Sequence, residues 1–315
     1  MTLETRYLGL ALRSPLVASA SPLNGELPHL RALEEAGAGA VVLPSLFQEQ
    51  IEAPQLVLAD GPYGIGTDAY LELIRRAKAA LVIPVIASLN GDTASGWTDH
   101  AALLQEAGAD ALELNIYHVP VDLAQSGAAT EQRYLDVLAA VRAVVQIPVA
   151  VKMPPYFSAI GHMAQRFVDA GANGLVLFNR YLQPDIDLAH LRLSNEMALS
   201  RPAEMRLPLL WTAVLAERIP CSLAGSTGVE TVDEVVKYLL AGADVVMTTA
   251  AVLRHGPGHI GTLCTGLRDW LQAHDNAALD EVRGMLSHAR LQQPGSYERT
   301  NYLALVENFT QGYRT

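Results

Sequence analysis

The tripeptide Ala-Gly-Ala recurs along the chain and constrains the fold more than any other feature of the sequence. It occupies residues 36–38, 107–109, 170–172 and 241–243, each time just before a short, mostly apolar run. A glycine in this setting is suited to ending a helix in the left-handed conformation, and the run is typical of a buried strand. The glycines lie 71, 63 and 71 residues apart, which leaves room for two β/α units per interval.

Four further apolar runs, each opened by a proline, fill the intervals at residues 15–19, 84–88, 148–152 and 220–224. Eight strands therefore alternate with helical patterns at 26–36, 67–80, 94–107, 129–144, 160–170, 208–218, 231–241 and 259–273. This alternation predicts an α/β fold of the (β/α)₈ (TIM) barrel type. An open doubly wound sheet is the alternative, but no Gly-x-Gly-x-x-Gly turn follows the first strand.

The chain has 315 residues, half of them hydrophobic, so residues 1–275 can form one barrel domain with a large core. Residues 47–66 and 180–207 are expected to be extended βα loops, which lie on the active face of such a barrel. We expect residues 276–315 to form a C-terminal helical extension that packs on the barrel or on a partner.

The charge and cysteine content exclude several classes of protein. The net charge is −11, with no cluster of Lys and Arg, which argues against nucleic acid or an anionic membrane as the main partner. Two cysteines are too few for a disulfide framework, and the N-terminus lacks the pattern of a signal peptide. We therefore expect a cytoplasmic protein.

Function in a barrel is carried by the residues that follow the strands, and here they are polar but nearly uncharged. They lack the paired carboxylates of a glycosidase and the clustered ligands of a metal site, so no metal is expected. Lys152 ends a buried strand before Pro154 and Pro155, where it either meets a negative group or extends to solvent. The candidate site residues are Ala20, Ser45, Ser88, Asn90, Asn115, Tyr117, His118, Lys152, Asn179, Arg180, Gly225, Ser226, Thr227, Gly228, Thr249 and Ala250.

The segment Gly225-Ser226-Thr227-Gly228 offers successive backbone N–H groups and two hydroxyls before a predicted helix. Loops after the seventh and eighth strands commonly bind phosphate in this fold, although such a segment can also be a simple helix cap. Together with Lys152, the segment favours a phosphorylated heterocyclic cofactor, and FMN fits. A lysine beside the flavin would stabilise the negative charge that appears on reduction.

Several of these motifs together resemble the dihydroorotate dehydrogenase family, in particular its soluble first class. They are residues 150–157, the Glu113-Leu-Asn115 segment, Asn179 and residues 225–231, and the similarity extends from about residue 8 to residue 275. The resemblance implies an FMN-containing barrel in which Asn115 and Asn179 also reach the substrate. It places FMN contacts at Ala20, Ser45, Asn90, Asn115, Lys152, Gly225, Gly228 and the Thr249-Ala250 turn.

The chain departs from the family where the substrate would bind. The family carries a catalytic cysteine and a substrate-binding asparagine in the loop after Asn115, whereas this chain has His118 and Pro120 at those positions. The family's Lys-Ser after the second strand is Pro44-Ser45 here, and its next substrate loop has become residues 60–66. The residues expected to bind the cofactor therefore match the family, whereas those expected to bind orotate differ from it.

These patterns lead to one leading hypothesis, an FMN-dependent oxidoreductase that acts on a small cyclic substrate such as dihydroorotate. His118 is the candidate acid/base, since its pKa suits proton transfer near neutral pH, or it merely binds a loop or a substrate oxygen. Tyr117 either donates to a substrate carbonyl or packs in a lid, and Arg180 binds a substrate carboxylate or faces solvent.

The expected partners are the substrate and a second copy of the chain, and an electron-transfer protein could be a third. Two alternatives remain open at this level. One is an FMN-binding subunit that relays electrons without turning over dihydroorotate, and the other is a non-redox lyase in which Lys152 forms a Schiff base.

Overall fold

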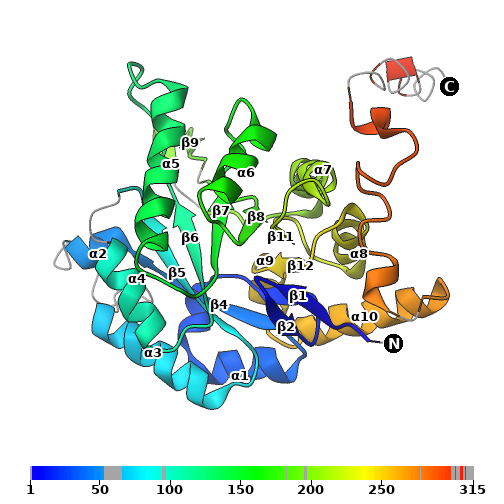
Figure 1. The fold of residues 1–315 in the computed structure, drawn as a ribbon, viewed down its shortest axis with the longest axis horizontal. Coiled ribbons are helices and arrows are strands. Elements are labelled where there is room, and N and C mark those ends of the chain that lie inside the picture. Colours follow the sequence, from blue (N-terminus) through cyan, green and yellow to red (C-terminus); the bar gives the residue numbers. More distant parts are fainter. Residues whose placement is uncertain are drawn as a thin grey trace.

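The computed structural model describes residues 2–52, 66–93, 97–181, 183–194, 197–276 and 278–298, together with 302, 306, 307 and 309. Eight parallel strands close into a barrel in the order β11-β12-β3-β4-β5-β6-β7-β8 (Figure 1). The barrel strands are β3 (Leu16–Ala18), β4 (Ala40–Phe47), β5 (Val85–Gly91), β6 (Ala111–Ile116), β7 (Val149–Met153), β8 (Gly174–Leu177), β11 (Ser222–Gly225) and β12 (Val245–Thr248). The predicted (β/α)₈ barrel is confirmed, with all eight of its strands.

Helices surround the barrel and alternate with its strands (Figure 1). The long ones are α1 (Leu27–Glu35), α3 (Thr67–Ala80), α4 (Trp97–Glu106), α5 (Gly127–Arg142), α6 (Ile160–Asp169), α7 (Arg206–Leu215), α8 (Val232–Ala241) and α10 (His259–Ala273). Two short helices, α2 (Gln48–Glu52) and α9 (Ala250–His255), follow β4 and β12 directly.

The recurring Ala-Gly-Ala unit ends α1, α4, α6 and α8 as the sequence predicts. Gly37, Gly108, Gly171 and Gly242 have φ between +99° and +112°, the left-handed region. The alanine after each glycine donates its N–H back to the helix, as Ala243 does to the carbonyl of Tyr238 at 2.9 Å. The four helices therefore end in the same way, with a left-handed glycine, and the chain enters the next strand directly after each of them.

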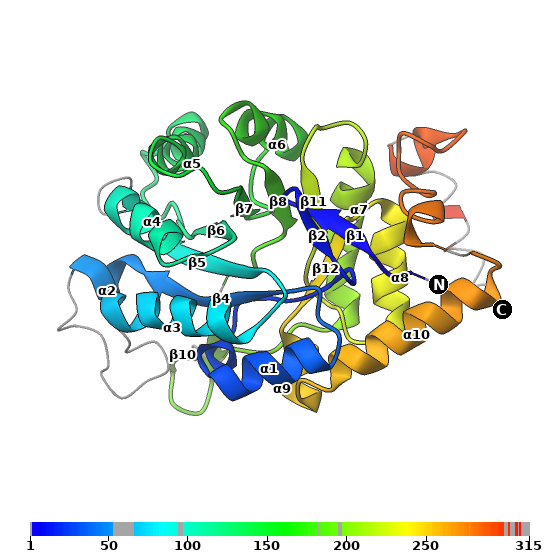
Figure 2. The same cartoon turned by 60° about the horizontal axis from the view of Figure 1, so that its bottom comes forward.

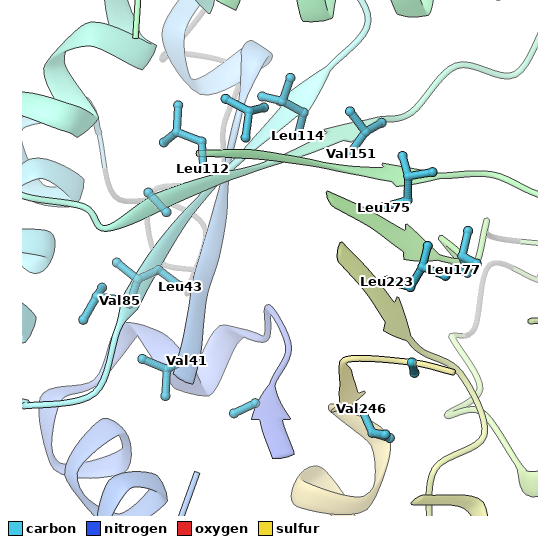
Figure 3. Packing of buried hydrophobic residues seen from close by; sticks show 14 of the residues in the cluster. Val41, Leu43, Val85, Leu112, Leu114, Val151, Leu175, Leu177, Leu223 and Val246 are labelled. Atoms are coloured by element: carbon cyan, nitrogen blue, oxygen red, sulfur yellow. The ribbon is translucent and has the colours of Figure 1, made fainter. Parts of the chain in front are cut away.

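The barrel strands separate two buried layers. Side chains on the outer faces, such as Leu43, Leu112 and Val246, pack beneath the helices (Figure 3). Smaller side chains on the inner faces, such as Val42, Ala111 and Ala150, form a second cluster inside the barrel. Because successive residues of a strand alternate between the two faces, Glu113 and Asn115 follow Ala111 into the interior.

An N-terminal hairpin that the sequence did not reveal closes one end of the barrel. Strands β1 (Thr5–Tyr7) and β2 (Leu10–Leu12) pair antiparallel and lie across the ring of strands (Figure 2). Tyr7, Leu8 and Leu12 join the inner cluster, and the Leu8 N–H donates to Ser222 Oγ at 3.0 Å. The hairpin therefore seals the face opposite the strand ends that carry the candidate site.

Both expected long loops carry structure of their own. The described part of residues 47–66 includes α2, while residues 53–65 lie outside the described residues, as does most of the predicted substrate loop at 60–66. Residues 180–207 carry a hairpin of β9 (Asp185–Asp187) and β10 (Arg192–Ser194), followed by a 3₁₀ helix over Pro202–Met205. The sequence predicted extended loops but not these strands, because three-residue strands leave too short a pattern to recognise.

Up to residue 298, the described part of the C-terminal tail consists mainly of turns and two short 3₁₀ helices, Leu279–Glu281 and Pro294–Tyr297, and the described residues 302, 306, 307 and 309 are helical. Its backbone is tied to the barrel's helices: Gly284 donates to the carbonyl of Leu239, and His288 to that of Ala213, both at 2.9 Å. The division of the chain at residue 275 stays a prediction.

Candidate functional site

A cavity of about 590 Å³ opens at the carboxyl ends of the barrel strands. Residues from the ends of β3, β7, β8, β11 and β12 line it, together with residues of the 180–207 loop. Nine of the candidate residues lie in its wall: Ala20, Lys152, Asn179, Arg180, Ser226, Thr227, Gly228, Thr249 and Ala250. Residues from distant parts of the sequence are thus gathered around one space, at the end of the barrel where function is expected.

The loop after β11 forms a concave wall of backbone donors. The Tyr238 hydroxyl on α8 donates to the carbonyls of Ser226 and Thr227, at 2.6 and 2.9 Å. In a trans peptide the N–H points opposite to the carbonyl, so the N–H groups of Thr227 and Gly228 face away from Tyr238. The Gly228 N–H donates to Oγ of Ser200, a cavity-lining residue, at 3.2 Å.

The backbone of this loop is also held in an unusual conformation. Thr227 and Gly228 have φ of 81° and 75°, and a non-glycine residue in this region is uncommon. A Cβ placed on Gly225 would lie 2.4 Å from the Tyr238 ring, and one on Gly228 would lie 2.8 Å from the Arg201 carbonyl oxygen. The two glycines are therefore required by close packing behind the loop, and not only by the turn itself.

Lys152 reaches the cavity from inside the barrel and has a buried carboxylate beneath it. Its side chain is 13% exposed, and its Nζ lies 3.9 Å from Oε1 of Glu113, whose side chain is 1% exposed. Burial raises the pKa of Glu113, and the charge of Lys152 partly offsets that rise. The sequence left two alternatives for Lys152, a negative partner or extension to solvent, and the structure gives it a negative partner in Glu113.

Five predicted cofactor residues do not line the main cavity: Ser45, Ser88, Asn90, Asn115 and Gly225. Ser45 and Ser88 hydrogen-bond to each other through their hydroxyls at 2.9 Å, and Ser88 is fully buried. Asn115 accepts a hydrogen bond from the side-chain amide of Asn179, which does line the cavity. The predicted pair of asparagines is thus brought together, whereas the two serines bond to each other outside the lining of the cavity.

His118 lies beside a second, smaller cavity of about 280 Å³. Its Nδ1 is 2.8 Å from Oδ2 of Asp92, and its Nε2 faces the side-chain amide of Gln125 at 3.2–3.4 Å. Arg133 lies 3.4 Å from the same Asp92 oxygen. An aspartate on Nδ1 fixes the orientation of an imidazole and leaves Nε2 to exchange a proton.

Tyr181 stands between the two cavities and contributes to both walls, as do Tyr156 and Gln183. Its hydroxyl hydrogen-bonds with that of Tyr134 at 2.7 Å and accepts from the His118 N–H at 3.3 Å. Burial raises the pKa of Tyr181 strongly. Tyr117 packs its ring on that of Tyr181, with centroids 4.2 Å apart.

Arg180 lines the main cavity but already has partners within the chain. Its Nε donates to Oε1 of Glu204 at 2.9 Å, and its guanidinium also donates to the carbonyl of Ala198. A substrate carboxylate would have to compete with Glu204 for this side chain.

Sequence reasoning missed three residues that shape the site: Glu113, Asp92 and Tyr181. Glu113 was noticed only as part of a motif, although a charged residue inside an apolar strand, two positions before Asn115, signals a buried charge. Asp92 and Tyr181 left no comparable signal, because their roles depend on contacts across 26 and 63 residues of sequence with His118.

The described residues contain neither a metal-binding cluster of side chains nor a membrane-spanning helix. They contain no group of three or more His, Cys, Asp or Glu side chains arranged to hold a metal ion. Within the same residues, no helix combines the length and the apolar character needed to cross a membrane.

The chain is similar to known proteins over most of its length. Residues 44–271 match the family model described as dihydroorotate dehydrogenase. The chain is 27% identical over 300 residues to the dihydroorotate dehydrogenase B (NAD(+)) catalytic subunit of Methanothermobacter thermautotrophicus, covering 90% of this chain and 98% of that protein. It is 29% identical to the protein of the same name from Pyrococcus abyssi, with the same coverage.

A relative named for a different activity is also similar over most of this chain. The chain is 25% identical over 295 residues to the chloroplastic dihydropyrimidine dehydrogenase (NADP(+)) of Arabidopsis thaliana, covering 88% of this chain and 68% of that protein. The resemblance noted from the motifs is thus confirmed, and the chain belongs to the dihydroorotate dehydrogenase family of oxidoreductases.

Proposed function

We propose that this protein is an FMN-dependent oxidoreductase that removes hydrogen from, or adds it to, a carbon–carbon bond of a small cyclic substrate. The observation that carries the proposal is the shape of the main cavity, which has Lys152 at one side and the Ser226–Gly228 loop at another. Its volume of about 590 Å³ falls within the range of roughly 300–1,000 Å³ found for small-molecule sites.

The donor set of the cavity suits FMN. The Thr227 N–H and the hydroxyls of Ser226 and Thr227 suit a phosphate, and the Gly228 N–H would join them on leaving Ser200 Oγ. The close packing of Gly225 and Gly228 holds that loop in place. Lys152 supplies a cation for the ring system. When bound, FMN would accept a hydride at its N5 atom and would carry negative charge in its reduced form.

The chain's own residues would bind and orient the substrate. In this proposal, Lys152 stabilises the negative charge of the reduced site, while the amide of Asn179, which Asn115 orients, fixes the substrate ring by hydrogen bonds. His118 lines the second cavity, so the substrate would extend past Tyr181 to reach it. There His118 takes or gives the proton on the adjacent carbon through Nε2, because Nδ1 is paired with Asp92. Gln125 would have to leave Nε2 when the substrate arrives.

The substrate class follows from the relatives and from the departures near His118. Relatives are named for dihydroorotate and for dihydropyrimidine, so a reduced pyrimidine ring is common to both names. Dihydroorotate is the leading candidate. A neutral dihydropyrimidine is the second, and one observation favours it: Arg180, a cavity cation that could bind a carboxylate, is paired with Glu204.

The electron-relay alternative has one observation in its favour. The two archaeal relatives are named as catalytic subunits, which implies for them a companion protein. We therefore also propose an electron-transfer partner. Homodimer formation and a cytoplasmic location stay predictions, and family membership favours the redox reading of Lys152 over the Schiff-base reading.

Anaerobic absorption spectroscopy tests the proposal. FMN-loaded protein is mixed with dihydroorotate, dihydrouracil or dihydrothymine, and bleaching of the flavin band by one of them is the expected result. His118→Ala should bind FMN normally but bleach slowly. Loaded protein that dithionite reduces and none of the dihydropyrimidines reduces would support the relay and contradict the substrate class.

A further inference from the structure

The interior of the barrel below Lys152 contains a carboxylate whose partners are unusual. Neither carboxylate oxygen of Glu113 has a hydrogen-bond partner among the residues that the structure describes. The group is 1% exposed and sits between Ser88 of β5 and Ala150 of β7 in the strand register. A buried carboxylate without hydrogen bonds is costly, and ordinary packing would not require one here.

The Lys152 ammonium compensates this charge only partly. At 3.9 Å the contact is an ion pair, but it is too long for a hydrogen bond. Lys152 also lines the main cavity, whereas Glu113 does not, so Lys152 separates the carboxylate from the cavity. A negative charge that develops in the cavity beside Lys152 would interact with the same ammonium that compensates Glu113, so the two negative charges would share one cation.

The other titratable groups around Glu113 cannot share this response. Tyr7 comes from the N-terminal hairpin and Tyr70 from α3, and the charge of Glu113 is among the causes that raise their pKa values. Burial is the larger cause in both cases, so both hydroxyls stay neutral at physiological pH. Lys152 and Glu113 are thus left to respond to a change of charge in the cavity.

We propose that Glu113 is a redox-linked proton acceptor, which takes up one proton from solvent when the cofactor site beside Lys152 gains negative charge. Two electrons and one proton enter the cofactor from the reductant, and a second proton converts the Glu113 carboxylate to the acid. The net charge of the site then stays constant through the redox cycle. Glu113 is a positioning residue in this scheme, since it acts on the cofactor through Lys152.

The inference rests on the proposed FMN site. The midpoint potential of the bound flavin should accordingly depend on pH. Each proton taken up per two electrons lowers that potential by about 30 mV per pH unit, because one pH unit is a tenfold change in proton concentration. Uptake at both the cofactor and Glu113 therefore gives about 60 mV per pH unit near neutral pH.

The experiment is a spectroelectrochemical titration of FMN-loaded protein at several pH values around neutrality, with Glu113→Gln as the test variant. The expected slope is about 60 mV per pH unit for the unaltered protein and about 30 mV for E113Q, which keeps the shape but cannot take up a proton. The matched control is Glu106→Gln, an exposed glutamate on α4, for which the unaltered slope is expected. Equal slopes for the unaltered protein and E113Q would overturn the inference.

Infrared difference spectroscopy of the unaltered protein tests the same proton uptake by Glu113 if E113Q does not fold. The reduced-minus-oxidised infrared spectrum of the unaltered protein should show a new carbonyl band of a protonated carboxylic acid, which shifts in D₂O. The absence of that band would overturn the inference while leaving the FMN site intact. A protein that binds no FMN would contradict the proposed function itself, and with it the role of Glu113.

Discussion

Replacement of Gly225 by alanine tests how the wall of the main cavity is held. A Cβ at this position would lie 2.4, 2.6 and 3.0 Å from three carbons of the Tyr238 ring. Tyr238 is fully buried, and its hydroxyl binds the carbonyls of Ser226 and Thr227. The ring must therefore move, and the loop that it holds must move with it.

The cost has two parts. Overpacking of a buried ring costs about 1–3 kcal/mol, and the loss of two hydrogen bonds adds about 1–3 kcal/mol. We expect Gly225→Ala to lower the free energy of unfolding by about 2–5 kcal/mol, given that some of the strain relaxes. Tyr238→Phe removes only the hydroxyl and should lose about 1–3 kcal/mol.

Urea unfolding followed by circular dichroism measures both losses. The matched control is Gly127→Ala at the start of α5, where a Cβ would meet no atom within 4 Å, and it should leave the urea midpoint unchanged or slightly higher. FMN affinity should also fall for the Gly225 variant, by about tenfold for each 1.4 kcal/mol of binding energy lost. A Gly225→Ala protein as stable as the unaltered chain would refute the packing argument.

Three other outcomes are expected. His118→Ala should slow reduction of the flavin by substrate by about 10²–10⁴-fold and leave reduction by dithionite unchanged, and Asp92→Asn should slow the substrate reaction less. A stopped-flow rate of reduction by substrate for His118→Ala within about twofold of that of the unaltered protein would contradict the assigned role. Tyr181→Phe should lower the free energy of unfolding by about 1–3 kcal/mol, because the Tyr134 hydroxyl and the His118 N–H lose a partner. Burial raises the pKa of five buried tyrosines, so their contribution to stability is complete below the unfolded pKa of about 10, and the free energy of unfolding falls as the pH rises above it. A urea midpoint that holds steady up to pH 11 would contradict this. These tyrosines are Tyr7, Tyr70, Tyr134, Tyr181 and Tyr238.

The barrel could be predicted from the sequence because its signals are local. A glycine that ends a helix and an apolar run that follows are adjacent in the chain, and the four Ala-Gly-Ala units showed both. The N-terminal hairpin was missed because its strands are three residues long and become buried only against the interior of the finished barrel. Such burial is a tertiary effect that no short window of sequence displays.

The candidate site was predictable to the extent that its residues end strands. Lys152, Asn179 and the Ser226–Gly228 loop meet at one cavity because the carboxyl ends of parallel strands share one face. The orientation of the His118 imidazole was not predictable, since it depends on contacts with Asp92 and Gln125, and on Arg133 beside Asp92. Ser45 was assigned to the cofactor by the family resemblance and Ser88 by its place at a strand end, and the structure pairs them with each other, outside the lining of the cavity.

Titration of FMN into the purified protein, depleted of any bound flavin, is the most direct test of the central claim. The account predicts binding of one FMN per chain, seen as quenching of flavin fluorescence, with much weaker binding when Lys152 is replaced by methionine. Lys237, an exposed lysine on α8, provides the matched control, and its replacement by methionine should leave the affinity unchanged. Failure of the unaltered protein to bind FMN, or equal affinity in the Lys152 variant, would contradict the account.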